Sequence, residues 1–300
     1  MTKPTFIAID WGTSNARFAL VDENGAMLEE KQGQGIAKID GAAAIEFTCF
    51  EAIADWITLH PALPVLMAGM VGSNIGWREA AYVETPASIR KIISAANLFE
   101  ARGTRFAILP GVKTERQADG LPDLMRGEET QIIGTAKDGL ICLPGTHSKW
   151  VRLTDGEIAA FHTAQTGELL ELLGKHSILL NPRRAPTAQI GPSFKDGVET
   201  ACRNALGLES LLFTVRSRQV TSGLPAEDAD SYLAGLVIGS EIRSALISHD
   251  GSETVQLIGS PGLTALYAAA LDVAGKRSTQ VDGQTASLAG LARAYQDIFG

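Results

Sequence analysis

Asp10 is the first side chain in this sequence whose position suggests chemistry. It ends the apolar run Phe6 to Ile9, and a glycine turn with two hydroxyl side chains follows at Gly12, Thr13 and Ser14. Two apolar β segments joined by such a turn are typical of a hairpin. The turn presents backbone N–H groups and hydroxyls to an anion, and a carboxylate at a strand end can face Mg²⁺ on that anion. The alternative is an ordinary edge hairpin with a solvated aspartate.

A second glycine turn repeats this pattern near the middle of the chain. When Gly145 is set on Gly12, the apolar runs 140–143 and 150–153 fall on the two strands of the first hairpin. One short glycine motif is weak evidence, but internal repetition is stronger. The repeat predicts paired lobes that hold a phosphate chain, and it favours the metal role of Asp10 over the solvated alternative.

Two adjacent glutamates open a short helix predicted over about residues 125–134. A glutamate at a helix start usually complements the macrodipole. Glu128, however, lies where the two halves of the chain meet, which favours a catalytic base, and we interpret Glu129 as its solvated or capping neighbour. Arg126 beside them could pair with a substrate carboxylate or with an acid of the other lobe, and we favour the carboxylate.

Two further strands, predicted over 64–70 and 254–258, run into glycine-containing loops. Ligands of α/β folds lie at such strand ends, and phosphate groups lie at the helix N-termini that follow. Trp77, after the first of these strands, is apolar bulk by default, although it could wall a sugar pocket. The small residues of the two loops are Gly72 and Ser73, and Gly259 and Gly262.

The composition limits the class of protein. The chain has 300 residues, 45% of them hydrophobic and 20% charged, as in ordinary globular proteins of about two domains. The net charge of −8 and the lack of a basic tract argue against nucleic-acid binding. No apolar run reaches the roughly 18 residues of a membrane span. The three scattered cysteines favour a reducing cytoplasm over a disulfide framework or a zinc site, and the start of the sequence leaves no room for a signal peptide.

The remaining pattern alternates strands and helices, which predicts an α/β fold. We place the boundary between two lobes near residue 135, giving domains 1–135 and 136–300, because no flexible linker is evident. The helices predicted from apolar periodicity cover residues 42–59, 88–100, 166–173, 195–212, 226–248, 263–271 and 287–299.

Taken together, these motifs resemble the actin-like sugar kinase superfamily and, within it, the 2-dehydro-3-deoxygalactonokinases. The resemblance spans nearly the whole chain and its motifs occur in the family's order. The matching stretches are AIDWGTSNARFAL (8–20), MAGMVGSNIGWREAAYV (67–83), DLMRGEETQIIG (123–134), LPGTHSKWV (143–151), TGELLELLGKHSIL (166–179) and LIGSPGLTALYAAAL (257–271).

The resemblance implies two actin-like, ribonuclease H-like lobes with an ATP cleft between them. It assigns Mg²⁺ binding to Asp10 and the role of catalytic base to Glu128. In many relatives the base is an aspartate, which keeps the choice between Glu128 and Glu129 open. Arg17, which alternates with apolar residues along its strand, would hold phosphate or simply be exposed. The implied first phosphate loop contains Gly12, Thr13, Ser14, Asn15 and Arg17; the second contains Gly145, Thr146 and His147; Gly259 and Gly262 lie under the adenosine; and Met70, Gly72, Ser73, Trp77 and Arg126 face the sugar acid.

The implied reaction is ATP-dependent phosphorylation of 2-dehydro-3-deoxy-D-galactonate at its terminal hydroxyl, with Mg²⁺, in cytoplasmic galactonate catabolism. The expected partner is this small sugar acid, with no nucleic acid and no membrane, and a homodimer stays open. His147 is equally compatible with phosphate binding and with closing its own loop. Two rival functions remain: an actin-like kinase for another sugar or sugar acid, and an ATP-binding sensor that is not a kinase.

Overall fold

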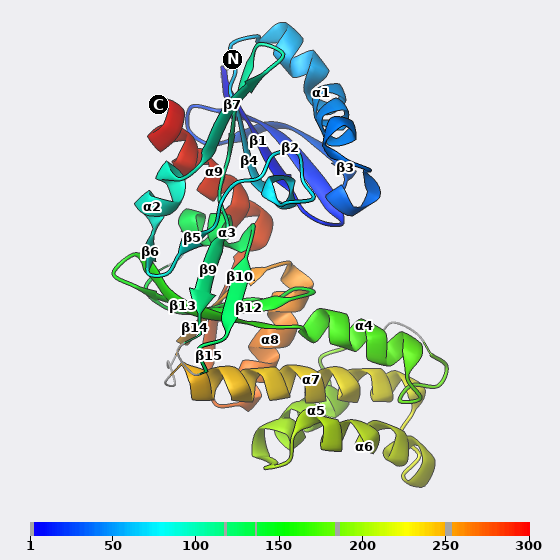
Figure 1. Ribbon diagram of the computed structural model, residues 1–300. Coiled ribbons are helices and arrows are strands. Elements are labelled where there is room, and N and C mark those ends of the chain that lie inside the picture. Colours follow the sequence, from blue (N-terminus) through cyan, green and yellow to red (C-terminus); the bar gives the residue numbers. More distant parts are fainter. Residues whose placement is uncertain (1–2, 117–118, 136, 184–186, 250–253) are drawn as a thin grey trace. The chain divides into compact units, whose positions relative to one another are not determined.

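The computed structural model describes residues 3–116, 119–135, 137–183, 187–249 and 254–300. The chain forms two compact units (Figure 1). The first contains Met1–Asp138, Leu153–Ala160 and Gly283–Gly300, and the second contains Gly139–Arg152 and Phe161–Asp282.

A six-stranded sheet forms the centre of the first unit, in the order β3-β2-β1-β4-β8-β7. The strands β1, β2 and β3 form an antiparallel meander, whereas β1, β4 and β8 run parallel. The strand bounds are β1 Pro4–Trp11, β2 Asn15–Asp22, β3 Met27–Gln34, β4 Val65–Gly69, β7 Asn97–Ala101 and β8 Thr104–Ile108.

Alternation along β1 divides its side chains between two helices. Ile7, Ile9 and Trp11 join a buried cluster with the apolar face of α1 (Ala42–Leu59). The residues between them face α9 (Gly283–Phe299), where Phe6 stacks on Tyr295 with 4.4 Å between ring centroids. Asp10 is therefore on the α9 side of the sheet.

The C-terminal helix α9 also packs closely against α3 (Glu128–Thr135). A Cβ on Gly290 of α9 would lie 1.9 Å from the carbonyl oxygen of Thr130, so only glycine allows the two helices to approach this far. Residues 283–300 consequently belong to the first unit, whereas the predicted boundary at 135/136 had placed them in the second lobe. Residue 136 itself lies outside the described residues.

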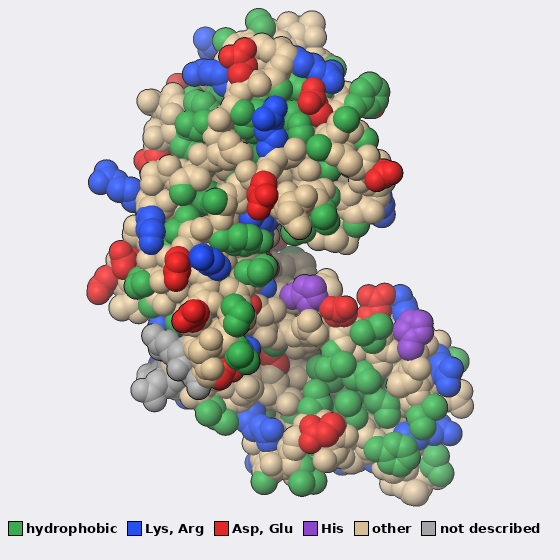
Figure 2. Space-filling view, in the orientation of Figure 1, with side chains coloured by type: hydrophobic (Ala, Val, Ile, Leu, Met, Phe, Trp, Pro, Cys, Tyr) green, Lys and Arg blue, Asp and Glu red, His purple; other side chains and the backbone are tan. Residues whose placement is uncertain are grey.

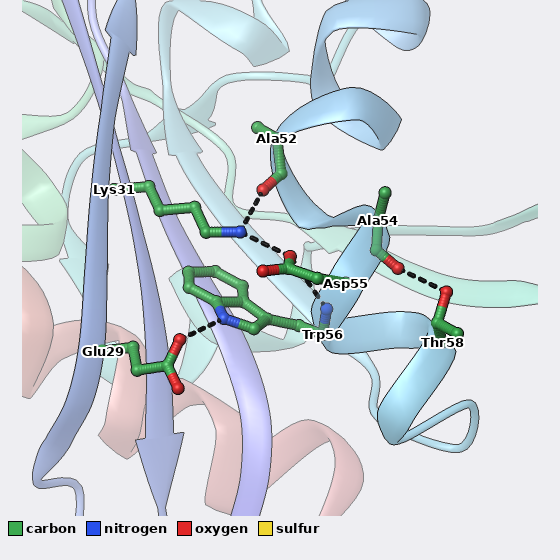
Figure 3. A network of polar contacts seen from close by, with 7 residues as sticks. All are labelled: Glu29, Lys31, Ala52, Ala54, Asp55, Trp56 and Thr58. Carbon is green, nitrogen blue, oxygen red and sulfur yellow. Dashed lines mark hydrogen bonds and ion pairs between the residues drawn. The ribbon is translucent and has the colours of Figure 1, made fainter.

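Polar contacts fix α1 on the edge strand β3 (Figure 3). Lys31 of β3 lies 4.3 Å above the Trp56 ring, donates to the Ala52 carbonyl oxygen at 2.9 Å and pairs with Asp55. The Trp56 indole N–H donates to Glu29 at 2.7 Å. The edge strand β3, which carries several exposed charged side chains, is thus attached to α1 through polar contacts.

A second sheet repeats the strand pattern of the first; most of its residues belong to the second unit, whereas Leu153–Ala160, at the end of β12 and the start of β13, are grouped with the first unit. Its strand order β13-β12-β11-β14-β15 corresponds to β3-β2-β1-β4-β8, with β11, β14 and β15 parallel like β1, β4 and β8. This confirms the predicted duplication. The strands are β11 Gly139–Leu143, β12 Ser148–Thr154, β13 Glu157–Ala164, β14 Thr254–Gly259 and β15 Arg277–Asp282.

Helices cover this second sheet. The long α7 packs against α5, and its apolar side chains join those of the strands and α8 in one buried cluster. The helices are α4 Thr166–His176, α5 Pro192–Arg203, α6 Leu208–Thr221, α7 Ala226–Ser248 and α8 Pro261–Val273. Among the described residues, no helix combines the length and apolarity that crossing a membrane requires.

Smaller elements complete the first unit. A three-stranded sheet has the order β10-β9-β5, and β6 pairs with the start of β13. These elements are η1 Ile36–Lys38, η2 Met70–Gly72, β5 Val83–Glu84, β6 Ala87–Ser88, α2 Ile89–Ser94, β9 Val112–Glu115 and β10 Pro122–Met125.

Two predicted helices differ from the structure. The helix predicted over 88–100 ends as α2 at Ser94, and a tight turn at Arg102 and Gly103, both with positive φ, returns β7 onto β8. The helix predicted over 195–212 is divided into α5 and α6, because the chain is extended at Asn204 and restarts at the N-cap Gly207.

Candidate active site

Asp10 lies opposite Arg17 in the β1–β2 hairpin, so both side chains project from the same face of the sheet. Its Oδ2 accepts a hydrogen bond from Ser287 of α9 at 3.0 Å and lies 3.6 Å from the Arg17 guanidinium. Burial raises the pKa of Asp10, while Ser287 and Arg17 lower it. The side chain is still 25% exposed, so one carboxylate edge can meet a ligand.

The first glycine turn is held from its carbonyl side. The carbonyl oxygens of Gly12, Thr13 and Ser14 accept hydrogen bonds from the backbone N–H groups of residues 36, 37 and 35, at 3.1 Å each. The side chains of Thr13, Ser14 and Asn15 are exposed. The turn therefore keeps its hydroxyl and amide groups in solvent, as the phosphate-loop prediction requires, while Arg17 is engaged with Asp10.

The two glutamates of α3 have different environments. Glu128 is half-buried and accepts the Arg126 backbone N–H at 3.1 Å. Glu129 is fully buried, and both of its oxygens accept the Gly127 N–H, at 2.9 and 2.8 Å. Burial, and then the charge of Glu128, raise the pKa of Glu129 to about 8. Glu129 is therefore a capping residue, as one of our two alternatives proposed, but it is not solvated.

The beginning of α3 lies against the ends of the central strands. Gly127 has φ +112°, and a Cβ on it would lie 3.6 Å from the Cα of Gly69, at the end of β4. Gly69 in turn pairs with Trp11, next to Asp10. The fold thus brings the acidic turn before Glu128 to the strand ends that carry Asp10.

Arg126 is held in a cage of first-unit residues. Its guanidinium stacks on the Tyr82 ring at 4.3 Å, and Nη2 donates to the Ala80 carbonyl oxygen at 2.8 Å. A Cβ on Gly72 would lie 3.0 Å from Nη1, so the predicted loop residue Gly72 forms the floor of this cage. Nη1 is buried and has no hydrogen-bond partner among the described residues.

The other predicted sugar-site residues follow β4. Met70 and Gly72 form η2, and the Ser73 hydroxyl donates back to the Met70 carbonyl oxygen at 2.8 Å. Trp77 is 6% exposed and packs edge-on against Phe50, Phe99 and Phe106 in the core. The structure thus corrects the suggestion that Trp77 walls a sugar pocket: its ring fills the core beneath the loop.

In the second unit, the predicted second phosphate loop is fixed to the first turn of α4. The Thr146 carbonyl oxygen accepts the Glu168 N–H at 3.1 Å, and His147 Nε2 lies 2.6 Å from the Glu168 carboxylate. A Cβ on Gly167 would lie 2.5 Å from the Gly145 carbonyl oxygen, so glycine is required at this contact. His147 therefore closes its own loop, whereas its phosphate contact stays a prediction.

A cavity of about 250 Å³ begins at this loop, entirely within the second unit. The space-filling view shows a largely apolar surface over α4 and α7, which contribute part of its lining (Figure 2). Gly145 is at one side and α8 contributes Leu263, Leu266 and Tyr267. A Cβ on Gly259 would lie 3.5 Å from the Pro144 carbonyl oxygen, so the predicted adenosine turn adjoins the phosphate loop, whereas Gly262 is open to solvent.

The side chains around Asp10 suit a Mg²⁺ ion that takes most of its ligands from a nucleotide and from water. Among the described residues, no group of three or more His, Cys, Asp or Glu side chains could hold a metal. Mg²⁺ at phosphotransfer sites commonly uses one or two carboxylates, with phosphate oxygens and waters as the other ligands. A single partly exposed carboxylate beside a hydroxyl-rich turn fits that mode.

Several residues were missed from the sequence. Ser287 is a small polar residue on the last helix, and no local signal links it to Asp10. Tyr267 did carry a signal, because it lies within the largely apolar stretch of α8, whereas Glu241 has polar neighbours at Ser240 and Arg243 and was less conspicuous. Buried polar groups in such stretches are usually hydrogen-bonded to one another or to a functional loop.

Two units with the same strand order, each opening on a glycine hairpin, define the class: this is an actin-like sugar kinase fold. A family model described as 2-keto-3-deoxy-galactonokinase matches residues 10–294. The chain belongs to this family.

Similar proteins agree with that assignment. The chain is 37% identical to a "probable 2-dehydro-3-deoxygalactonokinase" of Rhizobium meliloti (98% of this chain, 97% of the relative). It is 36% identical to the 2-dehydro-3-deoxygalactonokinase of Escherichia coli (95% and 96%). The crystal structure of a "putative 2-dehydro-3-deoxygalactonokinase" from Sinorhizobium meliloti superimposes with a TM-score of 0.89 at 36% identity, covering 98% of this chain and 99% of that one.

Proposed function

We propose that this chain transfers the γ-phosphoryl group of ATP to the terminal 6-hydroxyl of 2-dehydro-3-deoxy-D-galactonate. The products are 2-dehydro-3-deoxy-6-phosphogalactonate and ADP. The observation that carries the proposal is the family match over residues 10–294, which includes Asp10, both glycine turns and the acidic start of α3. The reaction belongs to galactonate catabolism. Free Cys49, Cys142 and Cys202 suit the reducing cytoplasm, where ATP is also supplied.

The second unit is proposed to bind the nucleotide. Adenosine occupies the cavity between α4, α7 and α8, and the β-phosphate lies at Gly145 and Thr146. Three contacts of the loop with α4 hold its backbone N–H groups in place before the nucleotide arrives. Such preorganised donors lose little entropy on binding and stabilise charge on the phosphates.

The first unit is proposed to bind the γ-phosphate and the acceptor hydroxyl. Thr13, Ser14 and Asn15 contact phosphate oxygens, and Asp10 would hold Mg²⁺, which would neutralise part of the phosphate charge. Glu128 orients the acceptor hydroxyl and takes its proton. Glu129 is unsuited to this task, because its carboxyl is buried under the turn and a pKa of about 8 keeps it mostly protonated near pH 7.

Arg126 is proposed to recognise the substrate carboxylate. Its Nη1 is a buried donor without a partner among the described residues, and leaving such a donor unpaired is unfavourable. Rotation of the Gly72 loop away from Nη1 would open this donor to a carboxylate. The stacked Tyr82 ring and the Ala80 carbonyl oxygen would keep the guanidinium plane fixed meanwhile. An anion at this point sets which end of the sugar acid faces the phosphate.

The test is an acceptor panel with ATP and Mg²⁺, read by ADP release and by NMR of the product. We expect 2-dehydro-3-deoxygalactonate to be phosphorylated at its terminal carbon, and galactose and glucose to be poor acceptors. Arg126→Met, which keeps much of the stem, should raise the KM for the sugar acid and leave the KM for ATP unchanged. Equal kcat/KM for galactose and the keto-deoxy acid, or phosphate on another carbon, would contradict the proposal.

A further inference from the structure

The second unit contains a buried carboxylate that the proposed reaction does not use. Glu241 of α7 is 7% exposed. One of its oxygens accepts the Trp150 indole N–H at 2.6 Å, and the other accepts the Tyr267 hydroxyl at 2.6 Å. The Thr166 and Ser148 side chains also hydrogen-bond to it, and these bonds oppose the rise in pKa that burial causes.

These hydrogen bonds lead from Glu241 to the second phosphate loop. The Tyr267 hydroxyl donates to Glu241, and its oxygen lies 2.9 Å from Ser148 Oγ, whose single proton can be donated either to Tyr267 or to Glu241 itself. Ser148 Oγ in turn accepts the Gly145 N–H at 3.4 Å. An acceptor-only carboxylate thus directs the hydroxyl protons toward itself and leaves a lone pair of Ser148 for the loop backbone.

The donors to Glu241 come from the elements that surround the cavity. Thr166 begins α4, Tyr267 lies on α8, and both of these residues line the cavity. Ser148 and Trp150 belong to β12, which follows the loop directly. Glu241 itself is one turn from Ile238, a further lining residue on α7. One carboxylate therefore connects three helices that line the cavity, α4, α7 and α8, with the strand that follows the loop.

Packing alone does not account for this arrangement. Burying a carboxylate is unfavourable unless its hydrogen bonds are all satisfied, and apolar residues of similar size are often at least as stabilising. A satisfied buried polar network does, however, fix one geometry among several that an apolar core would allow.

We propose that Glu241 is a positioning residue for the nucleotide: through Tyr267, Ser148 and Thr166 it holds the Gly145–His147 loop and the cavity wall in the geometry that binds adenosine and phosphate together. This rests on the proposed assignment of the nucleotide to the second unit. The sugar-acid site contributes none of these residues, so the two ligands should respond differently to changes in the network.

The test compares ADP and sugar-acid binding by calorimetry in the full-length protein. Glu241→Gln keeps the side-chain shape, but its NH₂ group must face either Trp150 or Tyr267. Facing Trp150, which only donates, leaves a donor unpaired; facing Tyr267 turns the tyrosine proton toward Ser148 and so reverses the hydrogen bonds that lead to the loop. Leaving a buried donor unpaired typically weakens a site by roughly 5- to 150-fold, and we expect the Kd for ADP to rise within that range. The Kd for 2-dehydro-3-deoxygalactonate should change less than about twofold.

Tyr267→Phe is the second variant, because it keeps the ring and removes only the hydroxyl that links Glu241 to Ser148. It should weaken ADP binding in the same direction, and it decides the question if Glu241→Gln does not fold. Asp196→Asn is the matched control, since it removes a charge from the same unit at the α5–α6 ion pair with Arg218. Its Kd for ADP should equal that of the wild type.

The outcomes separate the two hypotheses. Wild-type protein that binds no ADP would reject the proposed nucleotide site and the role of Glu241 with it. Wild-type binding with folded Glu241→Gln and Tyr267→Phe variants that bind ADP equally well, and differ only in melting temperature, would reject the positioning role alone. Equal weakening of ADP and sugar-acid binding would also reject it, because that result indicates a general structural defect.

Discussion

Glu129→Gln should change how the stability of this protein depends on pH. Glu129 is fully buried at the first turn of α3, with Glu128 beside it, and its pKa is raised from 4.5 to about 8. Its charged neighbours are Glu128, which raises the pKa, and Arg126, which lowers it. Glutamine resembles the protonated glutamic acid, and its carbonyl oxygen can still accept the Gly127 N–H.

The sign and size of this pH dependence of the unfolding free energy follow from proton linkage. The folded protein holds the Glu129 proton more tightly than the unfolded chain does, so the stability from this group is fully present below pH 4.5 and is lost as pH rises through about 8. Each unit of pKa difference corresponds to about 1.4 kcal/mol. The wild type should therefore lose on the order of a few kcal/mol between pH 5 and pH 8 that the glutamine variant keeps.

Urea unfolding of both proteins across pH 5–8 measures this difference, and ADP release at pH 7 measures activity in the same samples. The stability advantage of Glu129→Gln should grow with pH, and its kcat should stay within a few-fold of wild type. Glu128→Gln is the paired control: it should lower kcat by about 10²- to 10⁴-fold. An advantage that is constant with pH would refute the raised pKa, and a collapse of kcat in Glu129→Gln instead of Glu128→Gln would show that the base was assigned to the wrong residue.

Three further variants test the supporting contacts. Ser287→Ala removes the donor to Asp10, and the Mg²⁺ concentration for half-maximal rate should rise about 5- to 10-fold, with ADP affinity unchanged. Gly167→Ala places a methyl group against the second phosphate loop, and calorimetry should show roughly tenfold weaker ADP binding. Trp56→Phe removes the N–H that donates to Glu29, and urea unfolding should show a loss of about 1–2 kcal/mol without a change in kcat.

Local sequence patterns predicted several helices and strands and the repeated strand pattern. The first hairpin, the helices 42–59 and 226–248, and the strand–glycine–helix sequence at 254–271 all appear where apolar periodicity and turn residues placed them. These elements are rich in apolar residues and are buried in the fold, α7 around its whole circumference over residues 229–239, so their local preference and their tertiary role agree. The duplication was visible for the same reason, because both sheets begin with the same strand–turn–strand pattern.

Long-range packing determined what the sequence did not predict. Residues 97–101 have no strong local preference, and they form β7 because a two-residue turn places Phe99 on Phe106. The last helix returns to the first unit because Gly290 allows contact with α3, a match between residues 160 positions apart in the chain. Neither periodicity nor capping contains that information.

The two glutamates show how such packing decides the chemistry. The sequence presents Glu128 and Glu129 as equivalent acids at one helix start. Gly127 has a φ of +112° that few other residues adopt, and its N–H donates to the buried carboxylate of Glu129, while Glu128 stays half-exposed. The buried acid keeps its proton near neutral pH and stabilises the turn, and the partly exposed acid stays available to a substrate hydroxyl. Two identical side chains that are adjacent in the sequence thus have different burial and different protonation, and only the partly exposed one fits the base that we propose.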